Sequence, residues 1–364
     1  MQPTNALINW PHIDEQSSEG RVGRNAVIFG LFGIAIVVFF VLELSVGYAN
    51  VPASSVLKIL MGDTTNTAWR DIVLVLRMPR AVTAIFASAA LATGGLMMQT
   101  LFRNPLAGPW VLGITAGARL GVSVILFLNG ATFNAIAVGS LARLGDLSLA
   151  TGACVGATVV LLLIAVIARK VNAVTLLIVG LMFQYLAPAL DGILAHMTPE
   201  DQRETFKMWY YAEFGEATWS QLEIMVPVIV AAATIALLLA KPLNALRLGE
   251  NYAGSMGENV RRTRLAALVS MVGLSGIVTA FCGPVSFLDL AVPHLCRGIF
   301  RTSDHRILMP AVLVTGALVG LAADFILHLP WKRHVFHLDY VTALIGAPVI
   351  LWIVLRNPAV REGL

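Results

Sequence analysis

The stretch KPLNALRLGENYAGSMGENVRRTR, residues 241–264, is a polar island between the sixth and the seventh long apolar runs of the chain. Its glycines, Gly249, Gly254 and Gly257, let the backbone turn sharply within a few residues. We therefore predict a short helix, a tight turn and a second short helix. A rigid, basic segment of this kind is typical of a cytoplasmic surface on which a partner protein docks.

The rest of the chain is strongly apolar. Hydrophobic residues make up 57% of the 364 residues and charged residues only 13%, and the mean hydropathy is +0.79. This composition leaves too little polar surface to cover a soluble globule of this length. A membrane-spanning helix needs about 20 apolar residues. We therefore expect an all-α polytopic membrane protein with about ten transmembrane helices, at residues 25–47, 73–101, 108–128, 147–169, 173–196, 221–240, 263–283, 284–300, 307–328 and 337–356.

An even number of spans places both ends of the chain on the same side of the membrane. The distribution of Lys and Arg over the loops favours the cytoplasm for that side. Residues 1–24 contain acidic residues and lack the apolar centre of a secretory signal, so we interpret them as a cytoplasmic tail. Residues 25–356 then form a single transmembrane domain, and residues 357–364 form a cytoplasmic C-terminal tail.

Several function classes are disfavoured by the sequence. Cys154, Cys282 and Cys296 all lie in apolar runs, which argues against a disulfide framework and against a metal site. The net charge of +4 follows from basic cytoplasmic loops and requires no nucleic-acid partner. No lysine follows a glycine, so the chain lacks the phosphate-binding loop of an ATPase. Any ATP hydrolysis must therefore come from another polypeptide.

Small residues and prolines indicate how the spans pack. Pairs of glycines recur at helical spacing, at positions 113, 117 and 121, 152 and 156, and 316 and 320. This spacing allows helix backbones to approach closely in a compact bundle. The segment CGPVSFLDLAVPHLCRGIF, residues 282–300, contains two prolines and is expected to be a short, broken span inside the bundle. His294 within it is interpreted as structural rather than as a ligand.

Seven motifs occur along the chain: RMPR at 77–80, LFRNPLAGPWVLGITAGARLG at 101–121, GENYAGSMGENVRRTR at 249–264, VPHLCR at 292–297, SDHRILMP at 303–310, LAAD at 321–324 and VTALIGAP at 341–348. In order and spacing, the region from about Arg77 to Arg356 resembles the FecCD/BtuC-type permease subunits of ATP-binding-cassette (ABC) importers. These importers carry iron siderophores, haem or cobalamin. The resemblance implies the type II permease fold and a chain that forms half of a translocation pathway.

The resemblance also implies four groups of functional residues. The segment that couples to the ATPase would comprise Leu248, Gly249, Glu250, Gly254, Gly257, Val260, Arg261, Arg262 and Arg264. Arg77 and Arg80 would bind carboxylates of a substrate-binding protein, although they could instead anchor their helix at the lipid headgroups. The inner gate would comprise Asn104 and Leu106 on one side, and Asn172, Ala173 and Val174 on the other. Asn172 could equally be a helix cap, and the arginines at 261, 262 and 264 could be ordinary cytoplasmic charges.

Some residues depart from the family pattern. Arg119, Asp191 and Asp289 lie within spans where the family usually has small or apolar residues, and Leu338 to Tyr340 replace a usual Pro-Val-Gly. A lone ionised residue within the bilayer is costly, so Arg119 is expected to pair with Asp289 or Asp191. These residues, together with Gln184, either line the pathway for a polar chelate or form structural pairs.

The implied partners are a second permease copy or a sister permease, two ATPase subunits, a periplasmic or lipid-anchored binding protein and membrane lipid. ATP and Mg would be held by the ATPase, with no cofactor on this chain, and the complex would lie in a bacterial inner membrane. A ferric siderophore is the expected cargo, with haem or cobalamin as alternatives. An ion-coupled secondary transporter would need a carboxylate relay, but Glu43, Asp191, Asp289 and Asp324 are scattered in the sequence. An embedded enzyme would need clustered histidines; His328 with HVFH at 334–337 could only recruit haem or a metal at the outer surface.

Overall fold

The computed structural model of the chain describes residues 15–356 except 48, 64, 106, 111, 131–145, 168–169, 172, 199, 201–203, 205–210, 212, 216 and 330–336. All regular elements in this described part are helices. The N-terminal half contains α1 (Glu15–Ser45), α2 (Ala53–Leu60), α3 (Thr67–Asp71), the π-helical η1 (Ile72–Arg77), α4 (Met78–Leu101), α5 (Ile114–Gly130), α6 (Asp146–Ile167) and α7 (Ala173–Met197). The C-terminal half contains α9 (Trp219–Leu238), α10 (Ala240–Leu248), α11 (Glu250–Ser255), α12 (Val260–Met271), the π-helical η3 (Val272–Gly276), α13 (Ile277–Cys282), α14 (Leu288–Phe300), α15 (His305–Leu327) and α16 (Leu338–Arg356).

The expectation of about ten spans is confirmed. Six continuous helical stretches are long and apolar enough to cross a membrane, and shorter apolar helices lie in α5, α7 and α16. The tenth element is α14, which has only 13 residues. Two spans are compound: α3, η1 and α4 run on continuously, and α12 continues through η3 into α13. The predicted single helices at 73–101 and 263–283 therefore each contain a π-helical turn, a feature that often marks functional or strained places.

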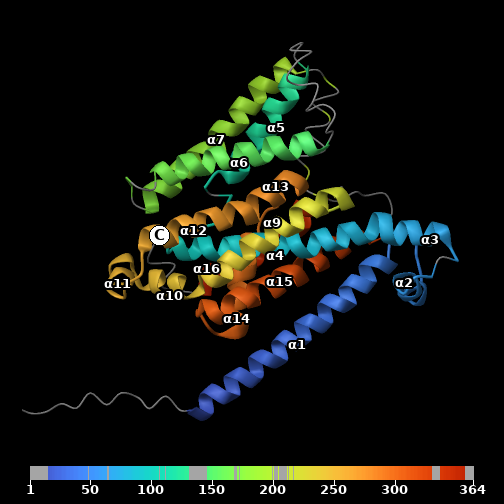
Figure 1. Cartoon of the computed structure of the whole chain (residues 1–364), viewed down its shortest axis with the longest axis horizontal. Coiled ribbons are helices and arrows are strands. Elements are labelled where there is room, and N and C mark those ends of the chain that lie inside the picture. The colour runs from blue at the N-terminus through green and yellow to red at the C-terminus, as the bar shows by residue number, and fades with distance from the viewer. Residues whose placement is uncertain are drawn as a thin grey trace, which may run out of the picture.

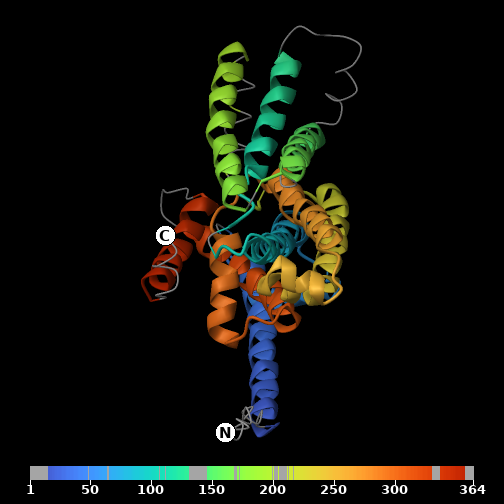
Figure 2. The same cartoon turned by 90° about the vertical axis from the view of Figure 1, so that its left-hand side faces the viewer.

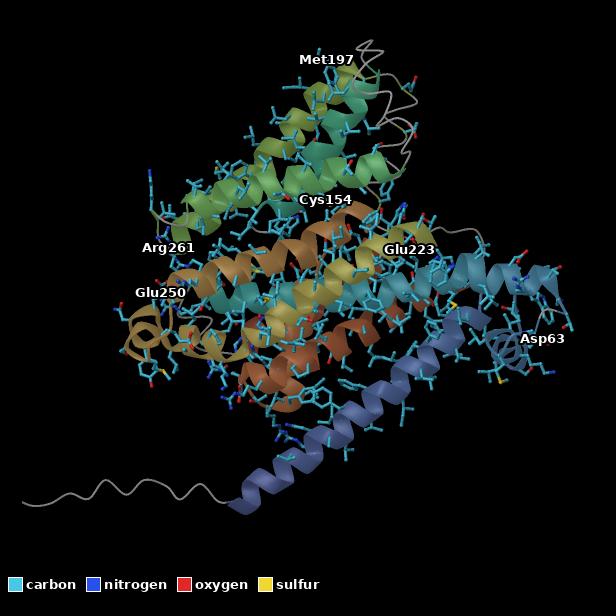
Figure 3. The ribbon with its side chains drawn as sticks, in the orientation of Figure 1. Asp63, Cys154, Met197, Glu223, Glu250 and Arg261 are labelled. Carbon is cyan, nitrogen blue, oxygen red and sulfur yellow. The ribbon has the colours of Figure 1, made fainter. Side chains whose placement is uncertain are left out.

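Helix α4 is the central helix of the bundle. Figures 1 and 2 show it enclosed by α9, α12, α14 and α15, and in the stretch Thr67–Leu101 83% of the membrane window is buried. Helix α1 packs along α15 at the edge, where only 11% of its window is buried. Helices α5, α6 and α7 form a separate group that leans outward from α13 and η3 (Figures 1 and 2). The exposed apolar side chains on α1 and α7, Met197 among them (Figure 3), suit contact with lipid or with another apolar surface.

The predicted glycine contacts are present. A Cβ added at Gly121 in α5 would overlap the carbonyl of Gly152 in α6, and one added at Gly156 would overlap the carbonyl of Gly117. On the other side of the bundle, Gly316 and Gly320 of α15 lie against the small residues of α4 around Ser88. Only glycine permits these backbones to approach so closely, as the small-residue rule for membrane helices requires.

The predicted broken span is also confirmed. The chain leaves α13 at Gly283, which has φ 71°, and enters α14 after Phe287, a non-glycine residue in the left-handed region with φ 67°. Helix α14 then ends at Arg301, with φ 50°. A Cβ at Gly95 of α4 would overlap the backbone carbonyl of Asp289, so α14 presses directly against the central helix. His294 Nε2 donates to the carbonyl oxygen of Pro105 at 2.9 Å, which agrees with its structural interpretation.

Candidate functional site

The polar island folds as predicted, into two short helices and a turn. Helix α10 ends at Gly249, whose φ of 125° and ψ of 151° no other residue type adopts easily, and α11 follows at once. The chain turns again at Gly257, with φ 86°, and α12 begins after Asn259. The Asn259 side chain accepts a hydrogen bond from the amide of Arg262 at 3.0 Å and so caps α12. We call residues 241–264, the segment expected to couple to the ATPase, the coupling loop.

The coupling loop exposes an apolar row flanked by positive charge. Leu248, Tyr252 and Met256 are all at least half exposed, and Arg261 and Arg262 are exposed beside them. Sequence reasoning named Leu248 and the arginines but missed Tyr252 and Met256. The available signal was that Tyr252 and Met256 are the two large apolar or aromatic residues in the otherwise polar or small stretch 249–259. A mixed surface of this kind is suited to a protein partner.

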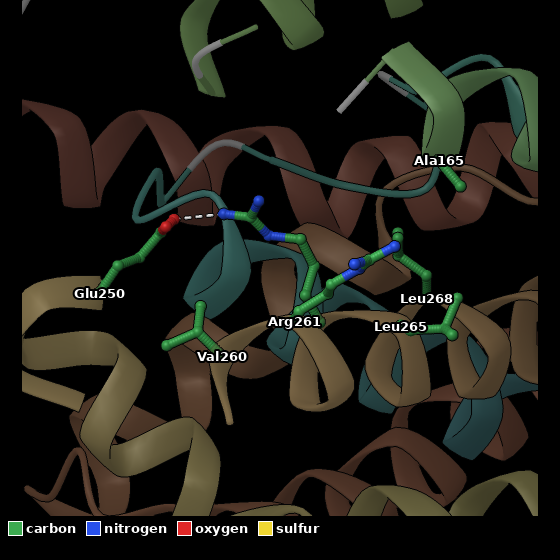
Figure 4. A pocket seen from close by; sticks show the side chains of 7 residues that line it. Ala165, Glu250, Val260, Arg261, Leu265 and Leu268 are labelled. Carbon is green, nitrogen blue, oxygen red and sulfur yellow. Dashed lines mark hydrogen bonds and ion pairs between the residues drawn. The ribbon is translucent and has the colours of Figure 1, made fainter. Parts of the chain in front are cut away.

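A cavity of about 490 Å³ lies between the coupling loop and the end of α6 (Figure 4). Its walls include Ala165 of α6, Leu265 and Leu268 of α12, and Arg261. Glu250 and Arg264 form an ion pair at its rim. Because both side chains remain substantially exposed, this pair contributes little to folding stability. The pair joins α11 to α12 and thereby helps to orient the loop.

The two turn glycines are expected to be sensitive to substitution for a conformational reason. No heavy atom lies within 4 Å of a Cβ added at Gly257, so crowding within the chain is absent there, and the positive φ is the constraint. We expect Gly249→Ala and Gly257→Ala each to destabilise the loop by about 1–3 kcal/mol. Gly254→Ala is the matched control, because Gly254 lies within α11 in open space and alanine favours a helix there. Amide hydrogen exchange of residues 249–258 measures the effect, and equal exchange in all three variants would contradict it.

The segment after α4, residues 102–113, is the candidate gate loop. Asn104 N donates to Gln99 O at 3.1 Å, and Ala107 N donates to Asn104 O at 3.1 Å. Arg103 has a positive φ of 47°, so the loop leaves α4 through a strained residue. Of the other predicted gate residues, Leu106 and Asn172 lie outside the described residues, while Ala173 and Val174 begin α7. Their role as a gate stays a prediction.

The structure selects one of the two predicted partners of Arg119. Arg119 Nε lies 2.8 Å from Asp191 Oδ2, and Ser123 donates to Asp191 Oδ1 at 2.8 Å. The pair joins α5 to α7. Gln184 of α7 similarly donates to the Trp110 carbonyl and, at 3.0 Å, to Thr115 Oγ1. Both arrangements hold α7 against α5 and the gate loop, and a direct role in the pathway stays a prediction.

Asp289, the other of the two expected partners, is not the one that pairs with Arg119. It is buried at the start of α14, and a Cβ added at Gly108 would overlap its carboxylate. The residue therefore packs α14 against the gate loop. The sequence could not reveal this contact, because Gly108, in the gate loop, and Asp289, in α14, are far apart in the chain.

Arg77 and Arg80 do not present free guanidinium groups at the outer rim, contrary to the expectation. Arg77 is only 6% exposed, and it donates to the carbonyl of Leu44 at 2.9 Å and to that of Ala49. Arg80 is paired with Glu43, and its Nε lies 3.2 Å from Asp324 Oδ2. The buried carboxylates and loop carbonyls draw both side chains inward. A docking role would require these internal bonds to break.

The carboxylates of Glu43 and Asp324, scattered in the sequence, thus meet at one place. Together with His328 they lie within 4.8 Å of one another, a spacing that would suit a metal ion. The guanidinium of Arg80 already supplies positive charge to both carboxylates. Asp191 is engaged elsewhere, with Arg119. Asp289 lies at a third place, against Gly108. In the described part of the chain these four acidic residues therefore lie at three separate places and do not line up as the continuous relay that ion-coupled transport requires. Of the outer histidines, His337 stacks on Tyr211 at 4.1 Å, and His334 lies outside the described residues.

His328, just beyond the end of α15, gives the outer end of the bundle a pH dependence. Burial acts to lower its pKa, but Asp324 and Glu213 outweigh burial and raise the pKa to about 10. Because the folded pKa exceeds the ordinary value of about 6.5, the stabilisation is complete below that pH and is lost as the pH rises towards 10. We expect the unfolding temperature in detergent to fall over that range, and to fall less in His328→Gln. Parallel pH profiles for the two proteins would refute this assignment.

Comparison with known proteins identifies the architecture. Residues 35–356 match the FecCD transport family. The chain belongs to this family. It is 33% identical over 336 residues to the hemin transport system permease HmuU of Yersinia pestis, covering 92% of this chain and 97% of that protein. It is also 33% identical over 345 residues to the ferric enterobactin permease FepD of Escherichia coli K12, covering 94% and 98%.

Two further comparisons agree with this assignment. The vitamin B12 import permease BtuC of Klebsiella pneumoniae is 32% identical over 282 residues, 78% of this chain and 82% of that protein. A solved metal-chelate type ABC transporter in an inward-facing conformation superposes with a TM-score of 0.77 at 23% identity, covering 91% of this chain and all of that one. The family and the type II permease fold expected from the motifs are confirmed. Membership in a transport family also supports the expectation that this chain is not itself an enzyme.

Proposed function

We propose that the chain is the permease subunit of an ABC importer and forms half of the pathway for a metal chelate, with a ferric siderophore as the cargo. The observation that carries the proposal is the coupling loop, a rigid turn between short helices in a chain that matches the FecCD family over residues 35–356. Its exposed row of Leu248, Tyr252 and Met256 provides a surface for the ATPase subunit. Relatives that carry haem and vitamin B12 make haem and cobalamin the alternative cargoes.

The mechanism is alternating access. Two ATPase subunits, which hold ATP and Mg, would close and displace the coupling loops of a permease pair. That displacement would open one gate of the pathway and shut the other. The partner permease is a second copy of this chain or a sister chain, and a binding protein delivers the chelate from outside. This chain forms no covalent intermediate and holds no cofactor of its own.

The proposed orientation places the termini and the coupling loop on the cytoplasmic side of a bacterial inner membrane. Two contacts support a shared side. Arg24, near the start of α1, donates to Phe300 O at 3.0 Å, and Arg247 of the coupling loop donates to Ser303 O at 2.6 Å. The beginning of α1 and the coupling loop therefore lie at the same end of the bundle, as Figure 1 also shows. That end carries Arg261 and Arg262, as expected from the excess of Lys and Arg in the cytoplasmic loops of membrane proteins.

The cargo is tested with the permease, its ATPase and its binding protein reconstituted in liposomes. Binding proteins loaded with ferric siderophore, haem or cobalamin are offered in turn, and uptake of iron or corrinoid is followed. We expect uptake of the ferric siderophore only. Uptake of haem or cobalamin instead would show that the importer carries a different cargo. If an assembled complex took up none of the three, the proposed function would be contradicted.

A further inference from the structure

A chain of hydrogen bonds, partly buried at Asn244 and Asp304 and fully buried at His305 and Thr100, joins the coupling loop to the last turn of the central helix. Asn244 of α10 donates from Nδ2 to Asp304 Oδ1 at 2.6 Å. Its Oδ1 lies 3.0 Å from the amide of His305 and 2.7 Å from His305 Nδ1. On the far side of the imidazole, Nε2 lies 2.7 Å from Thr100 Oγ1 of α4. His305 is 1% exposed and Thr100 is also buried, so water does not compete for the bond between these two side chains.

The direction of each hydrogen bond follows from the chemistry of the groups. The Asp304 carboxylate caps α15 by accepting from the Arg306 amide, and as a carboxylate it can only accept from Asn244. The amide nitrogen of Asn244 must therefore point to Asp304, and its oxygen must point to His305. An amide oxygen can only accept, so His305 Nδ1, 2.7 Å from it, carries a proton and donates. In the neutral imidazole, Nε2 carries no proton and can only accept, so the one proton of the Thr100 hydroxyl points to Nε2 at 2.7 Å rather than to the Leu96 carbonyl at 2.9 Å.

Thr100 stands directly before the gate loop. The amide of Arg103 donates to Thr100 O at 3.2 Å, and the amide of Asn104 donates to the neighbouring Gln99 O. The Gln99 side chain is held in turn by Arg297 of α14, whose Nη1 donates to Gln99 Oε1 at 2.6 Å. Near the start of the gate loop lies Arg103, a residue with a strained backbone. The guanidinium of Arg103 also lies beside Gly249, because a Cβ added at Gly249 would be 3.7 Å from Arg103 Nη1. The end of α4 is thus tied to the coupling loop on one side and to the gate loop on the other.

We propose that Asn244 and His305 are positioning residues that carry the movement of the coupling loop through Thr100 to the gate loop. The proposal rests on the proposed function, because it assigns the step that links ATP hydrolysis to the gate. Apolar surfaces can slide past each other, but a buried hydrogen bond cannot lengthen without leaving its donor or acceptor unsatisfied. The side chains of Asn244, His305 and Thr100 therefore move together, so a shift of α10 also shifts α4.

Thr100→Val is the test, because valine keeps the shape of the side chain and removes the hydroxyl. Thr93→Val is its matched control. Thr93 is also buried in α4, and its hydroxyl donates to Ala89 O at 2.8 Å, as that of Thr100 lies 2.9 Å from Leu96 O, yet Thr93 takes no part in the network. Both variants are reconstituted with the ATPase and the loaded binding protein. Assembly of the complex, the rate of ATP hydrolysis and the uptake of chelate are measured together.

We expect Thr100→Val to assemble and hydrolyse ATP while the ATP consumed per chelate imported rises about fivefold or more, the lower end of coupling factors between linked sites. Thr93→Val and Thr100→Ser, which keeps the hydroxyl, should retain the wild-type ratio. Asn244→Ala should raise the ATP consumed per chelate by a similar factor. The double variant Asn244→Ala with Thr100→Val should differ little from either single variant, because both substitutions interrupt the same series of hydrogen bonds.

The results distinguish a failure of the hydrogen-bonded link Asn244–His305–Thr100, which we call the relay, from a failure of the proposed function. If the wild type imports chelate and Thr100→Val consumes the same amount of ATP per chelate as Thr93→Val, the relay is overturned and the proposed function stands. If the assembled wild type imports none of the three chelates, the proposed function fails and the relay falls with it. If Thr100→Val does not assemble, the comparison of Asn244→Ala with the wild type decides the relay by the same ratio.

Discussion

Replacing Arg80 by methionine is expected to destabilise the bundle by about 3–5 kcal/mol, because it leaves Glu43 and Asp324 as uncompensated buried charges. The Glu43 side chain is 1% exposed, and Asp324 is fully buried. Only Arg80 and His328 supply positive charge within the described cluster. The measurement is the unfolding temperature of the purified chain in detergent, together with the yield of folded protein.

Two comparisons make this result specific to the buried cluster. Arg70→Met removes an exposed arginine from α3, close in sequence, and should leave the unfolding temperature unchanged. Adding Glu43→Gln and Asp324→Asn to Arg80→Met should restore much of the lost stability, since neutral groups need no counter-charge. The opposite pattern, in which Arg80→Met folds normally but loses the binding protein, would restore the docking role that the sequence suggested.

Gly121→Ala is expected to separate α5 from α6 and to cost about 1–3 kcal/mol, since even one added methyl group overpacks this contact. A Cβ at this position would overlap the carbonyl of Gly152, which belongs to the backbone and cannot rotate away. Helix α5 also carries Arg119, so its displacement would disturb the pair with Asp191 and the hold on α7. The unfolding temperature in detergent reports the first effect, and protease susceptibility of α7 reports the second.

Gly192→Ala provides the matched control in the same group of helices. No heavy atom lies within 4 Å of a Cβ at Gly192 in α7, so alanine there meets no obstacle and favours the helix by about 0.5–1 kcal/mol. The two substitutions are chemically identical and should have opposite signs. If Gly121→Ala were as stable as Gly192→Ala, the close contact of α5 with α6 would be wrong.

The sequence predicts most of the architecture because the relevant signals are local. Apolar runs locate the spans, and glycines four residues apart locate the crossing of α5 with α6. Gly249 and Gly257 mark the turns of the coupling loop because backbone conformation depends on the residue itself. The same reasoning reduced the partners of Arg119 to two, of which Asp191 is the one found.

What the sequence could not predict depends on contacts between distant residues. Arg77 and Arg80 are ambiguous in the sequence because a guanidinium turns inward only where acceptors are buried nearby. Those acceptors, on Glu43, Asp324 and Leu44, are brought together only by folding. The bond between Thr100 and His305 likewise joins positions 205 residues apart. A motif can identify such residues as unusual, but it does not say what they touch.

A comparison of energy sources shows whether ATP hydrolysed by a partner drives import through this chain. The complex is reconstituted in liposomes with the ATPase facing the lumen and the loaded binding protein outside. One preparation encloses ATP. The other encloses a non-hydrolysable ATP analogue, and a proton or sodium gradient is imposed across its membrane. We predict uptake of the chelate only with enclosed ATP; uptake driven by the gradient with the analogue present would contradict the account and indicate a secondary transporter.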